Sequence, residues 1–179
     1  MKILLGDPRH NTVGAHSYFV PIGIGYIGSN ILERFKNHNI ELKLCTDAKE
    51  IFVLLEKWKP DIIGISNYIW NSYLSNLICR QAKKINPNTL CILGGPEFPA
   101  GTGQRRIENT SLDNTYDKCL KYLLDRPSVD YFVWTDGEVA FPEIIKKFKD
   151  NNCSVKFMKD KDEAIKGCAS LSMDKTKLN

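Results

Sequence analysis

Short apolar runs alternate along this chain with longer segments in which apolar residues recur every three to four positions. The runs lie at residues 3–5, 40–45, 61–66, 89–93 and 129–134, and a segment with helical period follows each of them. Strands that alternate with helices in this way form a parallel sheet with crossover helices on both faces. The pattern therefore predicts an α/β domain built on five parallel strands.

The limits of this domain follow from the same pattern. Asp47, with Glu50 three residues later, has the spacing of a capping box and marks the start of a helix. We expect residues 1–150 to form the domain, because the apolar period fades beyond them. Residues 151–179 are expected to be a linker or the start of a further domain, with one more strand near residues 169–173.

Composition excludes several classes of protein. The chain has 25 Lys and Arg against 21 Asp and Glu, a net charge of +4, and the two signs are interleaved from Glu143 to Lys166. A basic stripe that would bind nucleic acid is not visible in this pattern. Residues 10–32 lack charged side chains, but their His, Asn, Ser and Pro residues and four Gly would leave a membrane helix polar and broken. We expect neither a nucleic-acid nor a membrane partner.

The six cysteines show no metal-binding spacing. Even the closest pair, Cys79 and Cys91, is too far apart for a CxxC motif. The start at residues 1–7 has no hydrophobic export region, so we expect a cytoplasmic protein with reduced thiols. Cys45 and Cys91 fall inside expected strands and are interpreted as small buried side chains.

The residues best suited to bind a ligand follow the carboxyl ends of the expected strands. In a flavodoxin-like (Rossmann-like) strand order, strands one, three, four and five are neighbours, so the loops after them border one crevice. The candidate residues are Pro21, Ile22, Gly23 and Gly25; Ser66, Asn67, Tyr68 and Trp70; Gly94, Gly95, Pro96 and Glu97; and Thr135, Asp136, Gly137 and Glu138. Single pairs such as Gly94-Gly95 are also common turns, so their shared edge carries the functional interpretation.

One motif in this set favours a different function. Gly23-x-Gly25-x-x-Gly28 matches the dinucleotide-binding pattern, and Asp47 follows about twenty residues later, where a ribose-binding carboxylate is expected. In that fold, however, the glycines form the tight turn that leaves the first strand, and here a long segment separates Gly6 from Gly23. An NAD(P)-binding oxidoreductase domain is therefore one alternative. A ligand-free interaction domain with the same sheet is the other.

Taken in order, several segments resemble the cobalamin-binding domain at the N-terminus of many B12-dependent radical SAM enzymes. They are Asp7-Pro8, residues 20–27 (VPIGIGYI), residues 60–66 (PDIIGIS), residues 94–97 (GGPE), Val129-Asp130 and residues 136–138 (DGE). The resemblance covers about residues 1–150. It implies a flavodoxin-like fold that binds cobalamin, and an intact enzyme that transfers methyl groups or performs related radical chemistry with S-adenosylmethionine.

The resemblance also implies roles for the candidate residues. Ser66 and its loop would lie near the lower face of the corrin ring and its nucleotide loop. Gly94-Gly95 would let the dimethylbenzimidazole tail lie against the fourth strand, with the turn at residues 136–138 nearby. Tyr68 and Trp70 would form an apolar floor beneath the macrocycle.

Two departures from the family pattern bear on function. The CxxxCxxC motif that holds a [4Fe-4S] cluster is absent, so the cluster and S-adenosylmethionine would belong to a radical SAM domain in cis or in trans, and this chain is not expected to be catalytic alone. Relatives that bind cobalt through histidine use Asp-x-His-x-x-Gly, and Ile22 stands at that histidine position. Because isoleucine cannot bind cobalt, His10 is the remaining candidate ligand. We expect cobalamin to be bound base-off, with no protein histidine on the cobalt.

Overall fold

The computed structural model describes residues 1–9, 20–99 and 112–179. Its strands are β1 (Lys2–Gly6), β2 (Glu41–Cys45), β3 (Ile62–Ser66), β4 (Leu90–Gly94), β5 (Tyr131–Val133) and β6 (Cys168–Ala169). They form one sheet in the order β2-β1-β3-β4-β5-β6, in which β1 to β5 are parallel and β6 is antiparallel to β5. The first five strands follow the flavodoxin-like order, so the predicted fold class is confirmed. The short β6 extends the five predicted strands.

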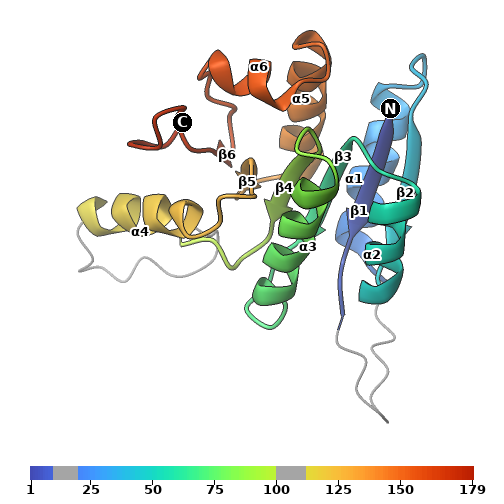
Figure 1. The fold of residues 1–179 in the computed structure, drawn as a ribbon, viewed down its shortest axis with the longest axis horizontal. Coiled ribbons are helices and arrows are strands. Elements are labelled where there is room, and N and C mark those ends of the chain that lie inside the picture. The colour runs from blue at the N-terminus through green and yellow to red at the C-terminus, as the bar shows by residue number, and fades with distance from the viewer. Residues whose placement is uncertain (10–19, 100–111) are drawn as a thin grey trace.

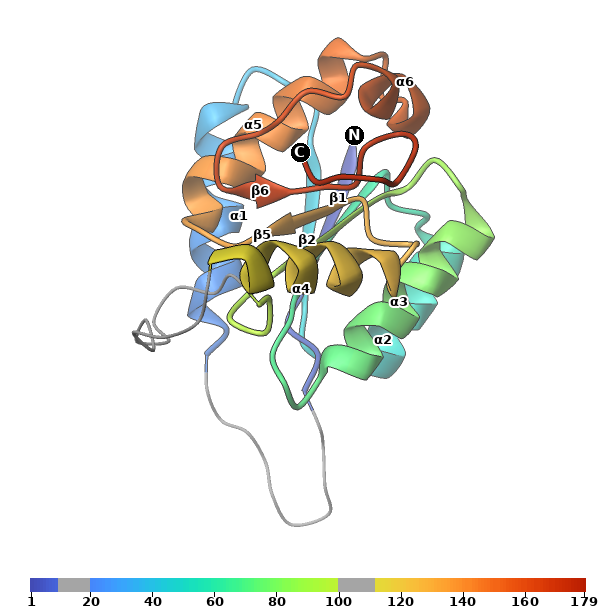
Figure 2. The ribbon, with the colours of Figure 1, turned by 90° about the vertical axis from the view of Figure 1, so that its left-hand side faces the viewer.

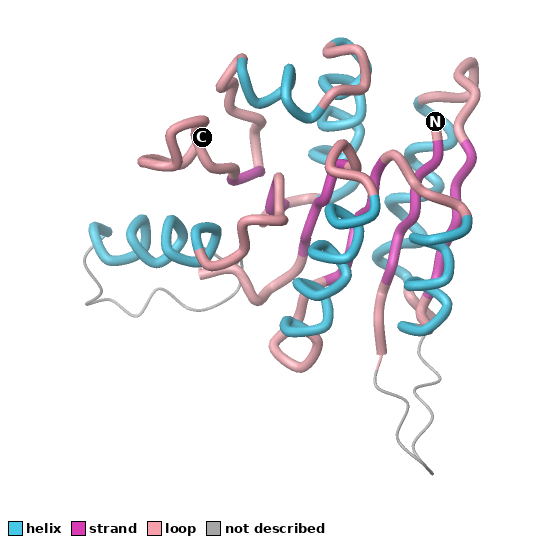
Figure 3. The backbone as a smooth tube through the Cα atoms, in the orientation of Figure 1, coloured by secondary structure: helices cyan, strands magenta, loops and turns pink. Residues whose placement is uncertain are grey.

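Helices cover both faces of this sheet, and they alternate with the strands along the chain (Figures 1 and 3). Helices α1 (Ile22–Arg34) and α5 (Gly137–Asp150) lie on one face, whereas α2 (Ala48–Lys57) and α3 (Ser72–Ile85) lie on the other (Figure 2). Helix α4 (Leu112–Leu124) packs on the α2–α3 side, and the short α6 (Val155–Asp160) packs on the α1–α5 side. None of the helices in the described ranges is long and apolar enough to cross a membrane.

The apolar strands are buried from both sides. In β1, Ile3 and Leu5 belong to the core beneath α1 and α5, whereas Leu4 belongs to the core beneath α2 and α3. Successive side chains of a strand point to opposite faces, so a sheet covered on both faces needs apolar residues at every position. This is why the strands stand out as continuous apolar runs in the sequence.

The segment expected to be a linker packs onto the same core. Within residues 151–179, Val155, Met158 and Ile165 are buried against the α1–α5 side of the sheet. They are too widely spaced to form a clear apolar period, which is why the sequence pattern fades there. The strand expected near residues 169–173 is β6, limited to two residues, with one further bridge between Leu171 and Leu178.

Candidate functional site

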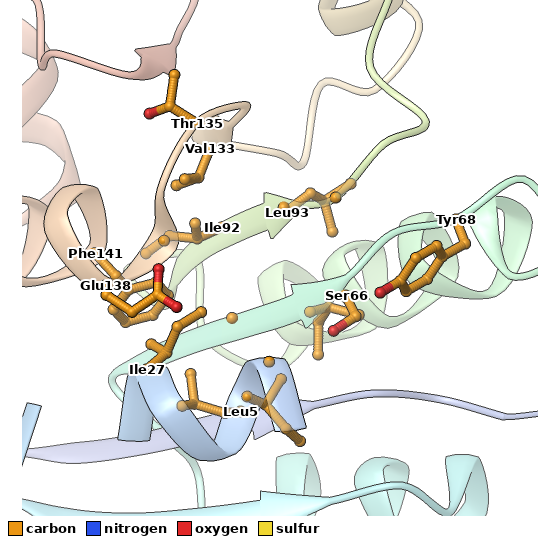
Figure 4. Close-up of a pocket in the computed structure, with 17 residues that line it drawn as sticks. Leu5, Ile27, Ser66, Tyr68, Ile92, Leu93, Val133, Thr135, Glu138 and Phe141 are labelled. Atoms are coloured by element: carbon orange, nitrogen blue, oxygen red, sulfur yellow. The ribbon is translucent and has the colours of Figure 1, made fainter. Parts of the chain in front are cut away.

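A cavity opens where the carboxyl ends of β1, β3, β4 and β5 meet, between the sheet and helices α1 and α5 (Figure 4). We call it the inner cavity; its volume is about 200 Å³. Its apolar walls come from Leu5, Ile24, Ile27, Ile65, Ile92, Leu93, Val133 and Phe141. Among the described residues that line it, Glu138 in the first turn of α5 is the single charged side chain. The cavity therefore suits a small, mostly apolar group with few polar atoms.

A wider space, the outer cavity, adjoins the inner one and has a volume of about 690 Å³. The two cavities share Gly23, Ile24, Ser66 and Tyr68. The remaining lining residues of the outer cavity are Asp7, Arg9, Val20, Pro21, Ile22 and Trp70. A ligand with a small apolar part joined to a larger part would fill both spaces.

The floor of the outer cavity is aromatic and its rim is polar. The rings of Tyr68 and Trp70 stack with centroids 4.5 Å apart and planes 7° apart, and 62% of Trp70 is exposed. At the rim, an Arg9 guanidinium nitrogen lies 3.0 Å from Asp7 Oδ2. Half-buried Tyr68 and exposed Trp70 together offer a flat apolar surface outside the core.

Three glycines near these cavities are not required by the packing of the described residues. Among the described residues, a Cβ atom added at Gly23 or Gly25 would meet nothing within 4 Å, and one at Gly94 would meet nothing nearer than the Val133 carbonyl oxygen at 3.5 Å. Gly23 and Gly25 lie in α1, where glycine costs about 0.5–1 kcal/mol relative to alanine. Gly23 and Gly94 line the inner cavity, so their bare backbone leaves room for the close approach of a ligand.

Other glycines at the same edge are explained by the fold. Gly95 has a φ of +132°, and an added Cβ would lie 2.5 Å from the Asn67 carbonyl oxygen. At Gly137, an added Cβ would lie 2.8 Å from Ile27 Cδ1. These two positions need glycine for the backbone or for helix packing, whatever binds nearby.

The structure brings most of the predicted site residues together. Those that line the inner or outer cavity are Pro21, Ile22, Gly23, Ser66, Tyr68, Trp70, Gly94, Gly95, Thr135, Gly137 and Glu138. Gly25, Asn67, Pro96, Glu97 and Asp136 line neither cavity in the described part of the chain. Pro96 and Asp136 are exposed, whereas Asn67 and Glu97 contact each other in a separate polar cluster.

Sequence reasoning missed the walls of the site. Gly64, in the middle of β3, lines the inner cavity, and a Cβ added there would lie 2.5 Å from the Phe141 ring and 2.8 Å from Leu5 Cδ2. A glycine inside a buried strand often marks such a close approach, so the break in the apolar run 62–65 was an available signal. The apolar wall residues carried no such signal, because they also read as ordinary core.

The geometry of a dinucleotide-binding turn is not formed at the glycine motif. Strand β1 ends at Gly6 and α1 begins at Ile22, so Gly23 lies inside the helix rather than in a tight turn after the strand. Gly28 is a packing position, since its added Cβ would lie 3.0 Å from Leu42 Cδ2. Asp47 Oδ1 accepts a hydrogen bond from the Glu50 amide at 2.8 Å, which confirms the predicted helix cap.

In the described ranges, side chains that bind metals are not grouped at this site. Ile22, which stands at the family's histidine position, is the first residue of α1 and lines the outer cavity. His10 lies outside the described residues. Among the described residues, no three His, Cys, Asp or Glu side chains are close enough together to hold a metal ion. Burial raises the pKa of the Cys45 thiol to about 11, so this thiol is protonated at neutral pH.

Comparisons with known proteins find partial relatives. No family model matches the chain. It is 30% identical over 87 residues to the cobalamin-dependent radical SAM methyltransferase TokK of Streptomyces tokunonensis. The aligned region covers 49% of this chain and 10% of that protein. It is 28% identical over 86 residues to the 2-(S-pantetheinyl)-carbapenam-3-carboxylate methyltransferase of Streptantibioticus cattleyicolor, covering 48% of this chain and 10% of that protein.

Two further similarities have wider coverage of this chain. It is 26% identical over 129 residues to the uncharacterised methyltransferase PH0819 of Pyrococcus horikoshii, covering 70% of this chain and 24% of that protein. Among solved structures, the receiver domain of a Francisella response regulator aligns with a TM-score of 0.41 and 18% identity, over 90% of this chain and 98% of that domain. The chain thus spans from a tenth to a quarter of the length of the methyltransferases. The sequence similarity supports the expected resemblance to a B12-binding domain in part.

Proposed function

We propose that this chain binds cobalamin across the inner and outer cavities, as the cofactor-holding module of a B12-dependent radical SAM methyltransferase or a related radical enzyme. The observation that carries the proposal is an apolar cavity bordered by two glycines, Gly23 and Gly94. In the described part of the chain, no neighbouring atom would exclude a side chain at either position. The partial similarity to a cobalamin-dependent methyltransferase supports the same reading.

The two cavities would hold different parts of the cofactor. The inner cavity would take the dimethylbenzimidazole tail, because its apolar walls exclude water and its volume of about 200 Å³ suits a bicyclic ring. The Glu138 carboxylate there would accept a hydrogen bond from a hydroxyl or amide. The stacked Tyr68 and Trp70 would support the corrin ring from below, and the Asp7–Arg9 pair would meet its amide side chains.

Bound cobalamin would supply a cobalt centre that accepts and donates a methyl group; the chain itself supplies binding and orientation. An aliphatic side chain such as Ile22 cannot coordinate a metal. We therefore propose that the lower face of the cobalt has no protein histidine and that the dimethylbenzimidazole base lies away from the metal. His10, outside the described residues, is the remaining candidate ligand.

The rim around the outer cavity suits a second protein domain. Val20, Ile69 and Tyr73 are 74%, 82% and 81% exposed, although all three are large and apolar. Exposed apolar side chains grouped at one edge mark interaction surfaces. We propose that a radical SAM domain, in cis or in trans, covers this rim and holds the [4Fe-4S] cluster and S-adenosylmethionine.

Absorbance titration with hydroxocobalamin tests the proposal. The wild type is expected to bind, and Gly94→Val is expected to weaken binding at least about tenfold, a loss of 1.4 kcal/mol, by placing a branched side chain in the inner cavity. Gly25→Val is the matched control, because a Cβ at Gly25 meets no described atom within 4 Å and Gly25 lines neither cavity. Binding of NAD(P)H in place of cobalamin, or equal cobalamin binding by folded Gly94→Val, would contradict it.

A further inference from the structure

A polar cluster joins the loops after β3 and β4 on the side away from the inner cavity. It consists of Asn67, Glu97, Tyr122 and Arg126, which we call the Asn67 cluster. Asn67 is fully buried, and its Nδ2 donates to Glu97 Oε2 at 3.0 Å and to Tyr122 Oη at 2.8 Å. Both bonds connect residues distant in sequence, so the cluster links β3, β4 and α4.

The cluster reaches the cavity through the backbone of Asn67. The Asn67 amide donates to the Gly94 carbonyl oxygen at 2.7 Å. Its own carbonyl oxygen lies so close to Gly95 that a Cβ there would come within 2.5 Å. Ser66 and Tyr68, on either side of Asn67, line both cavities. The position of the Asn67 peptide therefore sets the spacing between the two loops that form this part of the site.

Glu97 is the charged centre of the cluster. Its Oε1 lies 3.9 Å from an Arg126 guanidinium nitrogen, and both side chains are 19% exposed. The Arg126 guanidinium stacks over the Tyr122 ring at 3.6 Å from its centroid. The pKa of the Tyr122 phenol lies well above its usual value, mainly because the phenol is buried and secondly because it forms a hydrogen bond with Glu97. The phenol therefore keeps its proton. The carboxylate thus accepts hydrogen bonds in a partly buried place, where such bonds are strong.

We propose that Glu97 is a positioning residue for the ligand site: it holds the Asn67 side chain, and through it the Asn67 peptide, so that the loops after β3 and β4 keep the spacing a ligand needs. This rests on the proposed function and replaces the expected direct contact between Glu97 and the cofactor. The Glu97 carboxylate acts at the back of the loops, and Gly94 and Gly95 meet the ligand at the front.

Three variants test the role of Glu97. Glu97→Ala removes the hydrogen-bond acceptor; Glu97→Gln keeps an acceptor oxygen and removes the charge. Glu143→Ala is the matched control, because it breaks the Arg34–Glu143 pair of similar length, 3.8 Å, at exposed side chains outside both cavities. Two readouts are measured for each: exchange of the Asn67 amide relative to the core amide of Ile63, by NMR, and the dissociation constant for hydroxocobalamin.

We expect Glu97→Ala to speed exchange of the Asn67 amide about tenfold relative to Ile63, because a tenfold change matches the free energy of about one lost hydrogen bond. The same variant should weaken hydroxocobalamin binding about tenfold. Glu97→Gln should restore both to within about threefold, and Glu143→Ala should change neither. Equal acceleration at Asn67 and Ile63, or unchanged affinity in Glu97→Ala, overturns the positioning role. If the wild type binds no cobalamin, the proposed function fails, and the exchange readout alone decides whether Glu97 fixes the loop.

Discussion

The amino ends of the parallel strands form one edge of the sheet (the amino edge) and their carboxyl ends form the other (the carboxyl edge). The two edges differ in where polar and apolar side chains lie. At the amino edge, Asp130 is buried between Lys83 Nζ and Lys159 Nζ, each 2.6 Å from one of its oxygens, and it accepts the Cys91 amide at 2.8 Å. At the carboxyl edge, large apolar side chains are exposed and Gly94 leaves space unfilled. The amino edge thus buries a paired charge, whereas the carboxyl edge leaves apolar surface and space uncovered, which the proposed ligand and partner would fill.

The amino edge provides the largest expected effect. Asp130→Ala leaves Lys83 and Lys159 without their shared partner in a largely buried place and should lower the free energy of unfolding by about 3 kcal/mol. Urea unfolding measures the loss. The control is Asp125→Ala, which breaks an exposed pair with Lys121 and should cost less than about 0.5 kcal/mol. If both variants lost a similarly small free energy of unfolding, the buried ion pairs at the amino edge would stabilise the fold no more than an exposed pair does.

Glycines at the carboxyl edge separate packing from binding. Gly64→Ala would push a methyl group into the Phe141 ring and should cost about 2 kcal/mol of folding free energy by overpacking. Gly94→Ala, whose Cβ has room, should change stability by less than about 1 kcal/mol and instead weaken hydroxocobalamin binding. Thermal unfolding and absorbance titration together give both quantities. If Gly94→Ala were the more destabilising variant, Gly94 would be a packing glycine and its place in the binding argument would be lost.

The sequence predicts the framework better than the site because the two depend on different information. Strand positions follow from apolar runs, and the cap at Asp47 follows from its three-residue spacing to Glu50; both are local patterns. The placement of Asn67 and Glu97 is not local, since polar residues after a strand look the same whether they face a cavity or a neighbouring helix. Here Tyr122, far along the chain, accepts a hydrogen bond from Asn67 Nδ2, so the Asn67 side chain lies away from the cavity. Packing of residues 151–179 on α5 depends equally on distant partners.

Two glycines in α1 provide a smaller and opposite effect. Gly23→Ala and Gly25→Ala should each raise the free energy of unfolding by about 0.5–1 kcal/mol, because alanine favours the helix and its Cβ meets no described atom within 4 Å. Only Gly23 lines the cavities, so Gly23→Ala should also weaken hydroxocobalamin binding and Gly25→Ala should not. Thermal unfolding with parallel titrations measures this. Equal binding by both variants would show that the bare backbone at Gly23 has no part in ligand approach.

The smallest expected effect concerns the pH dependence of stability at two buried thiols, Cys45 and Cys168, both near the carboxyl ends of the parallel strands. Burial raises the pKa of Cys45, at the carboxyl end of β2, from 9.0 to about 11, and that of Cys168, in β6, from 9.0 to about 12. A raised pKa in the folded state means that the unfolded chain loses these protons first, so the thiols contribute fully below pH 9 and the contribution is lost as the pH rises through the folded-state values. Urea unfolding between pH 7 and 10 should therefore show stability that is insensitive to these thiols at neutral pH and falls above pH 9. Cys45→Ala and Cys168→Ala should each flatten that fall. An unchanged slope in both variants would mean that the alkaline loss comes from other groups and that burial does not raise the pKa of these thiols.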